Sequence, residues 1–90
     1  MDPVRRTLTI TNRLGLHMRA AAMLVQTASK FDAEVTITKE GQGVNGKSII
    51  GLMMLAAGQG SEIEVSIDGP QAEAAMTAIA DLLDRKFDEE

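Results

Sequence analysis

The chain contains one histidine, His17, and its neighbours are of the types that phosphoryl chemistry uses. Arg19 follows two positions later, and Gly15 stands two positions earlier, where a loop is expected to give way to a helix. The first N–H groups of a helix are unpaired and carry the positive end of its dipole, so this junction favours a phosphoryl group. The same field disfavours imidazolium and leaves the ring a neutral nucleophile, while an arginine can bind phosphate oxygens in a bidentate manner. The pattern predicts a phosphoryl-accepting histidine.

Other roles for His17 explain less of the segment. A histidine at a helix start can serve only as a polar cap, but capping accounts for the histidine and not for Gly15 or Arg19. A metal site needs several ligands, and His17 has no His or Cys nearby, with Asp32 as the first acid that follows it. No G-x-S-x-G motif suggests a hydrolytic triad. We therefore expect neither a metal nor another cofactor.

The composition limits the kinds of partner. The 90 residues carry a formal net charge of −4, with an acidic cluster at 88–90. Nucleic-acid binding needs a basic surface and benefits from aromatic platforms, but the chain has only two aromatic residues. The absence of cysteine is typical of a cytoplasmic protein, and the longest nearly apolar run, 49–58, is about half of a membrane span. One cytoplasmic domain over residues 1–90 is expected, without nucleic acid or membrane insertion.

Hydrophobic periodicity predicts the elements that must position His17. Alternating apolar residues indicate four strands, at Arg6–Thr11, Glu34–Thr38, Val44–Asn45 and Ser61–Ile67. Helical spacing indicates three helices, one from about Met18 to Phe31-Asp32, one of about two turns capped by Ser48 and stopped near Gly58, and one opened by Gly69-Pro70. The order is β-α-β-β-α-β-α. Alternation in the strands favours a four-stranded antiparallel sheet with three helices on one face, which is an α+β open-faced β-sandwich.

The segment 15–21, GLHMRAA, resembles the active-site motif of the HPr family, the phosphocarrier proteins of the bacterial phosphotransferase system. Two further segments match in order and separation. Residues 45–55, NGKSIIGLMML, resemble the family's regulatory serine segment, and the third match comprises residues 58–65 and 69–71. The resemblance covers about residues 4–87. It implies an HPr-like domain with the same open-faced β-sandwich.

The resemblance also implies roles for individual residues. His17 would accept phosphate through Nδ1 from the phosphorylated histidine of enzyme I and pass it to a histidine of an EIIA-type domain. Arg19 would stabilise the phosphoryl group. Ser48 would be phosphorylated by an HPr kinase/phosphorylase, which reduces transfer through His17, and a helix start favours such a phosphoserine. The chain would be a stoichiometric carrier and not an enzyme.

Apolar residues around His17 predict a docking surface. Ile49, Ile50 and Met53 occupy partner-facing positions of the family, and a helix of two turns buries only one face. Met18 departs from the family pattern, which usually has Ala, Ser, Thr or Pro at that position. A flexible methionine is expected to enlarge the docking surface and to leave transfer intact.

Two questions stay open from the sequence. The carrier could serve sugar transport or a regulatory branch like that of the nitrogen-related paralogue NPr. The alternative function is an HPr-like regulatory binding module that acts through Ser48 without phosphoryl transfer.

Overall fold

The computed structural model describes residues 2–89. The elements are β1 (Val4–Thr9), α1 (Met18–Ala28), β2 (Glu34–Lys39), β3 (Gln42–Asn45), α2 (Ile49–Met54), β4 (Glu62–Asp68) and α3 (Ala72–Asp84), followed by a short 3-10 helix, η1 (Lys86–Asp88). The predicted order β-α-β-β-α-β-α is confirmed. The 3-10 helix after α3 was not predicted.

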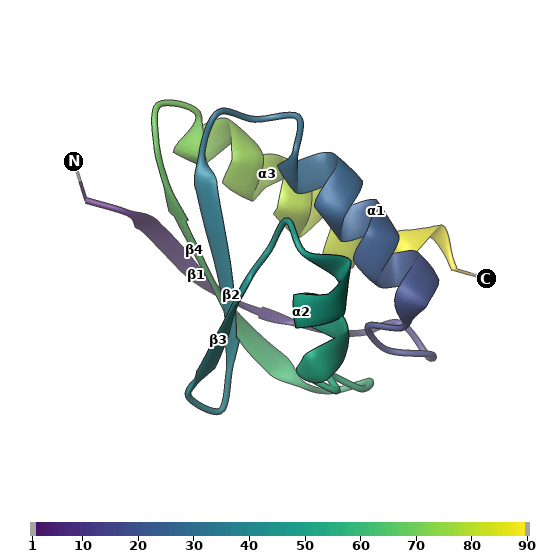
Figure 1. Cartoon of the computed structure of the whole chain (residues 1–90). Coiled ribbons are helices and arrows are strands. Elements are labelled where there is room, and N and C mark those ends of the chain that lie inside the picture. Colours follow the sequence, from purple (N-terminus) through teal and green to yellow (C-terminus); the bar gives the residue numbers. More distant parts are fainter. Residues whose placement is uncertain (1, 90) are drawn as a thin grey trace.

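The four strands form one antiparallel sheet in the order β1-β4-β2-β3. Val4 of β1 and Val35 of β2 both lie opposite Ile67 of β4, and these positions face the core. The alternate positions form the other face, where Thr7 lies opposite Glu64 and both are exposed. Figure 1 shows the helices gathered on one side of the sheet. The predicted open-faced arrangement is therefore confirmed.

The helices bury the apolar stripes that their spacing indicates. The six predicted stripe positions of α3 are all buried, namely Ala72, Ala75, Met76, Ile79, Leu82 and Leu83. On α1, the buried side chains are mostly alanines, with Leu24 as the large one. Alanine allows helices to approach closely, and α1 packs against both α3 and α2. The resulting core is aliphatic except for Phe87.

The predicted ends of the first strand and first helix were wrong. β1 runs over Val4–Thr9 and not over 6–11, because its partner β4 begins at Glu62, opposite Thr9. α1 ends at Ala28 and not at 31–32. The chain continues in tighter turns there, since the N–H of Phe31 donates to the carbonyl oxygen of Ala28. Apolar periodicity does not distinguish these turns from α-helix.

The later helices also differ from prediction at one end. α2 stops at Met54, before Gly58, because Ala56 adopts the left-handed conformation at φ 50°. α3 begins at Ala72, and Gly69-Pro70 lies in the preceding turn. Gly69 has φ 144°, and a Cβ there would lie 2.8 Å from the Cα of Ala33, so this turn requires glycine. The other strand ends differ by one or two residues from the predicted ones.

Candidate functional site

The loop between β1 and α1 holds His17 against the segment that follows α2. The N–H of Leu16 donates to the carbonyl oxygen of Ala57 at 2.8 Å, and the N–H of Gly15 donates to that of Asn12 at 3.1 Å. Gly15 has φ 69°, and a Cβ there would lie 2.8 Å from both the Ala57 oxygen and the Gly58 Cα. The predicted need for glycine thus has two causes, the backbone conformation and the close approach of a second loop.

Gly15→Ala is expected to reduce the free energy of unfolding by about 2 kcal/mol or more, because a left-handed alanine costs about 1–2 kcal/mol before any collision. Urea titration of the two proteins measures the loss. Gly41→Ala is the matched control. Gly41 also has positive φ, 83°, but its Cβ would have nothing within 4 Å. Equal losses in the two variants would contradict the role of close packing at Gly15.

His17 is the N-cap of α1. Its backbone is extended, with φ −79° and ψ 179°, and its Nδ1 accepts a hydrogen bond from the N–H of Ala20 at 3.1 Å. A ring nitrogen that accepts a hydrogen bond carries no proton, so the proton of the neutral imidazole is on Nε2. The side chain keeps 27% of its surface exposed. The Nδ1 lone pair is thus directed at the N-terminus of the helix, and the ring remains accessible.

The other ring nitrogen of His17 faces the C-terminal end of the chain. Oε1 of Glu89 lies 3.4 Å from Nε2 of His17 and accepts a hydrogen bond from Nδ2 of Asn12 at 3.0 Å. Oε2 of Glu89 accepts from the N–H of Leu14 at 3.1 Å. The hydrogen bond from Asn12 is the main cause that holds the pKa of Glu89 below its ordinary value, and the bond from Leu14 acts in the same direction. Glu89 is therefore a carboxylate anion beside the ring.

Asn12 connects this carboxylate to the loop. Its side chain is buried, and its Nδ2 also donates to the carbonyl oxygen of Gly15 at 2.7 Å. Its Oδ1 has no hydrogen-bond partner among residues 2–89. The sequence indicates Asn12 as part of a loop and Glu89 as part of an acidic cluster, and it assigns neither residue to the site. Sequence spacing gives no signal for a contact between positions 12 and 89, which the fold alone creates.

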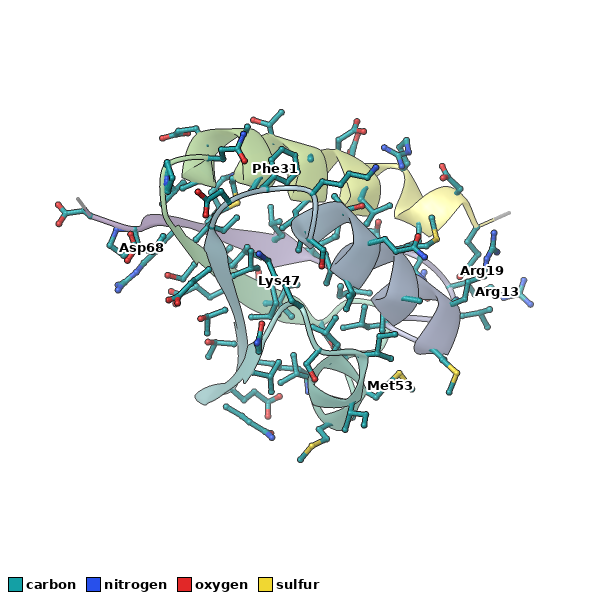
Figure 2. All side chains as sticks on the ribbon, turned by 45° about the horizontal axis from the view of Figure 1, so that its top comes forward. Arg13, Arg19, Phe31, Lys47, Met53 and Asp68 are labelled. Carbon is teal, nitrogen blue, oxygen red and sulfur yellow. The ribbon has the colours of Figure 1, made fainter. Side chains whose placement is uncertain are left out.

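Arg19 stands on the first turn of α1, exposed to solvent. Among the ion pairs formed by the described part of the chain, none involves Arg19. Figure 2 shows Arg19 near Arg13 at the end of the molecule where α1 begins and the C-terminal segment arrives. The structure thus places two cationic side chains at the His17 end of α1, of which the sequence indicated only Arg19.

Several large apolar side chains on α2 and around the start of α1 are exposed. The predicted docking residues are all exposed: Met18 at 67%, Ile49 at 38%, Ile50 at 76% and Met53 at 39%. Met53 projects from α2, which packs beside α1 (Figure 2). Leu14 and Met54 are each 64% exposed as well and were not predicted. We call the six residues together the apolar patch.

Ser48 is the N-cap of α2, as predicted. Its backbone is extended, with φ −120° and ψ 114°, and its Oγ accepts a hydrogen bond from the N–H of Gly51 at 3.0 Å. Ser48 lies on the side of α2 where β3 ends, since its own N–H donates to the carbonyl oxygen of Asn45 at 3.0 Å. The side chain is partly buried.

Residues 2–89 contain neither a metal-binding cluster nor a membrane-spanning helix. No group of three or more His, Cys, Asp and Glu side chains lies close enough together to hold a metal ion. No helix in that range is long and apolar enough to cross a membrane.

The chain has close relatives of known family. The family model described as "PTS HPr component phosphorylation site" matches residues 4–85. A phosphocarrier protein HPr of Xylella fastidiosa (strain Temecula1) is 52% identical over 83 residues, which cover 92% of this chain and 93% of the relative. A phosphocarrier protein NPr of Shewanella violacea is 46% identical over 89 residues, which cover 99% of this chain and 98% of the relative.

A solved structure agrees with the fold. The crystal structure of HPr-C-His from Thermoanaerobacter tengcongensis superposes with a TM-score of 0.93 at 44% identity, covering 97% of this chain and 98% of that one. Members of this family carry a phosphoryl group for the phosphotransferase system and do not catalyse a reaction of their own. With the family model matched over nearly the whole chain and relatives of about half identity, the chain belongs to the HPr family of phosphocarrier proteins.

Proposed function

We propose that His17 is the residue that carries the phosphoryl group and that Nδ1 forms the N–P bond. One observation carries this assignment: Nδ1 has no proton and points its lone pair at the N-terminus of α1. In the transfer, Nδ1 attacks phosphorus while the N–P bond of the donor breaks and its electron pair returns to the donor nitrogen. No proton has to leave Nδ1. The N–H of Ala20, freed from the ring, can then donate to a phosphoryl oxygen.

The donor in this proposal is the phosphorylated histidine of enzyme I, and the acceptor is a histidine of an EIIA-type domain. Both partners must place a histidine close to His17. The apolar patch supports this, because it offers both partners exposed flexible and aliphatic side chains on α2 and around the start of α1. Met18 is exposed to solvent, which suits a role in docking. All three proteins would meet in the cytoplasm.

The direct test is phosphorylation by enzyme I and phosphoenolpyruvate, followed by mapping of the label. We expect one phosphoryl group per chain, on His17, labile in acid and stable in base. A label on any other residue, or no label with a cognate enzyme I, would contradict the assignment. Presenting the labelled protein to EIIA-type domains of the sugar and nitrogen branches then identifies the pathway from the domain that takes the phosphate.

Arg19→Gln is expected to slow phosphorylation of His17 by about 10–100-fold, because a cation beside the transferring phosphoryl group stabilises the charge of the transition state. The free energy of unfolding should change by less than about 0.5 kcal/mol, since the side chain is exposed. Initial rates with limiting enzyme I measure the effect. Arg13→Gln removes the same charge from the preceding loop and serves as the matched control. Equal slowing in both variants would show a general charge effect.

We further propose that Ser48 is the site of regulation by an HPr kinase/phosphorylase. Its hydroxyl already caps α2, where a phosphoserine would gain from the helix N-terminus. With such a kinase and ATP we expect an acid-stable label on the native protein and on His17→Ala, and none on Ser48→Ala. The last variant should lose about 1 kcal/mol of stability with its cap. A label that persists in Ser48→Ala would place the modification elsewhere.

A further inference from the structure

The segment after α3 has an unusual backbone. Lys86, Phe87 and Asp88 have φ values of 56°, 55° and 57°, so three consecutive residues with side chains are left-handed. This conformation is unfavourable for any residue with a Cβ and persists only where the surroundings hold it. The segment therefore has to be fixed by its contacts, and those contacts show what the strained backbone achieves.

Two contacts anchor the turn itself. Phe87 is 2% exposed and belongs to the core, although its neighbours in the chain are at the surface. Nε of Arg85 donates to Oδ1 of Asp88 at 3.1 Å, and the same guanidinium pairs with Asp81 one turn earlier in α3. Reversing the chain over the buried phenylalanine turns Glu89, which follows the three left-handed residues, toward the start of α1. Figure 1 shows the C-terminal end beside the loop that precedes α1.

Both carboxylate oxygens of Glu89 are fixed by hydrogen bonds. The bonds from Asn12 and Leu14 orient the group so that Oε1 lies 3.4 Å from Nε2 of His17, with 13% of the Glu89 side chain exposed. These bonds also lower the pKa of Glu89, which keeps it ionised. The strained turn thus presents a fixed negative charge to the ring nitrogen opposite the one that points at the helix.

We propose that Glu89 is a positioning residue for phosphoryl transfer, whose carboxylate is the counter-ion of the His17 ring while Nδ1 carries the phosphoryl group. This inference rests on the proposed function of His17. The neutral ring has its proton on Nε2. When Nδ1 forms the N–P bond, Nε2 keeps that proton and the ring becomes positively charged. In onward transfer the N–P bond breaks, its electron pair returns to Nδ1, and the ring leaves as neutral imidazole.

Protonation of Nε2 matters because neutral imidazole is a far better leaving group than the imidazolate that an unprotonated ring would release. Arg13 and Arg19 lie at the same end of the molecule (Figure 2), and positive charges there would oppose protonation of the phosphorylated ring. α2 and the loop 55–60 contain no titratable residue, and the nearby Asp88 is bonded to Arg85. Among residues 2–89, the carboxylate within 4 Å of the ring nitrogen is that of Glu89. A close opposite charge favours the ionised form, so Glu89 should keep the phosphorylated ring protonated up to a higher pH.

The test is the pH dependence of hydrolysis of the isolated phosphorylated protein, which needs no acceptor. Water attacks phosphorus, the N–P bond breaks, and inorganic phosphate is released. For Glu89→Gln we expect the rate profile to move to lower pH by about 0.5–1 unit, because the pair is partly exposed. On the alkaline side of the profile this corresponds to about three- to tenfold slower hydrolysis. At low pH, where the ring is protonated in both proteins, the rates should converge.

Asp84→Asn is the matched control, since it removes one exposed carboxylate near the end of α3 that has no ion pair among the described residues. Its profile should coincide with that of the native protein. Equal displacement in both variants, or none in Glu89→Gln, would overturn the proposal. Glu89→Ala gives a second reading with the same expected displacement, should the glutamine variant fold poorly. Failure of the native protein to accept phosphate at all refutes the assignment of His17 instead, and is distinguishable because no phosphorylated protein then forms.

Discussion

Replacing His17 by alanine is expected to abolish phosphorylation by enzyme I completely. No other histidine exists in the chain, so nothing can replace Nδ1 as the nitrogen that forms the N–P bond. Incorporation of label from phosphoenolpyruvate, followed over the full time course, measures the loss. The expectation differs in kind from that for Arg19→Gln, where transfer slows but the acceptor remains.

Alanine also removes the cap of α1, which costs about 1 kcal/mol. His17→Asn is therefore the better matched variant, because asparagine caps helices well and cannot form a stable phosphoryl adduct. Both variants should be unlabelled, and His17→Asn should match the native protein in thermal stability. The variants also separate the carrier from the alternative regulatory module. A carrier loses all transfer without His17, whereas a module that acts through Ser48 would keep its effect on a partner. A native protein that shows such a Ser48-dependent effect but takes no label from a cognate enzyme I would contradict the carrier role.

Phe87→Ala is expected to produce the largest loss of stability. The ring is 2% exposed and is the only aromatic side chain in the core of the described residues, and truncating such a side chain costs about 3–5 kcal/mol. A small domain has only about 5–15 kcal/mol of stability in total. Since about 1 kcal/mol corresponds to roughly 4–8 °C for this length, thermal unfolding should move down by well over 10 °C.

Phe31→Ala is the control for this prediction, because Phe31 is the other aromatic residue and is only partly buried. Its loss should be about 1–2 kcal/mol, in proportion to the smaller apolar area removed from water. A Phe87→Ala protein as stable as Phe31→Ala would show that the turn after α3 is not anchored in the core. Phe87 also holds the turn that places Glu89. Phe87→Ala should therefore move the pH–rate profile of hydrolysis of the phosphorylated protein to lower pH, as Glu89→Gln does.

The positions of residues that local sequence patterns determine were predictable from the sequence. The contacts that distant segments of the chain make were not. Apolar spacing of 3.6 and 2 residues locates the helices and strands because each buries one face, and it placed His17 and Ser48 at helix starts. Helix ends were less predictable, because Ala56 takes a left-handed conformation that sequence patterns assign to glycine. Hydrophobic periodicity cannot predict a helix end that contacts elsewhere in the fold determine.

The part of the site that was missed comes from the C-terminus. The sequence indicates Glu89 as one member of an acidic cluster and Phe87 as one of two aromatic residues, with no sign that either belongs to the site. Only the strained turn over 86–88 reveals that the tail folds back on Asn12 and His17. Three left-handed residues with side chains run against local propensity, so no reading of propensity could have produced them. Leu14 was missed for the related reason that exposure depends on which neighbours cover a loop.

The central claim is that the chain carries a phosphoryl group on His17 from one protein to another. The most direct measurement is a chase. The protein is labelled on His17 with enzyme I and phosphoenolpyruvate, purified away from both, and mixed with an EIIA-type domain. The account predicts that the label leaves His17 and appears on a histidine of the EIIA-type domain, mole for mole. Label that stays on His17 with every EIIA-type domain, or is released only as inorganic phosphate, would contradict it.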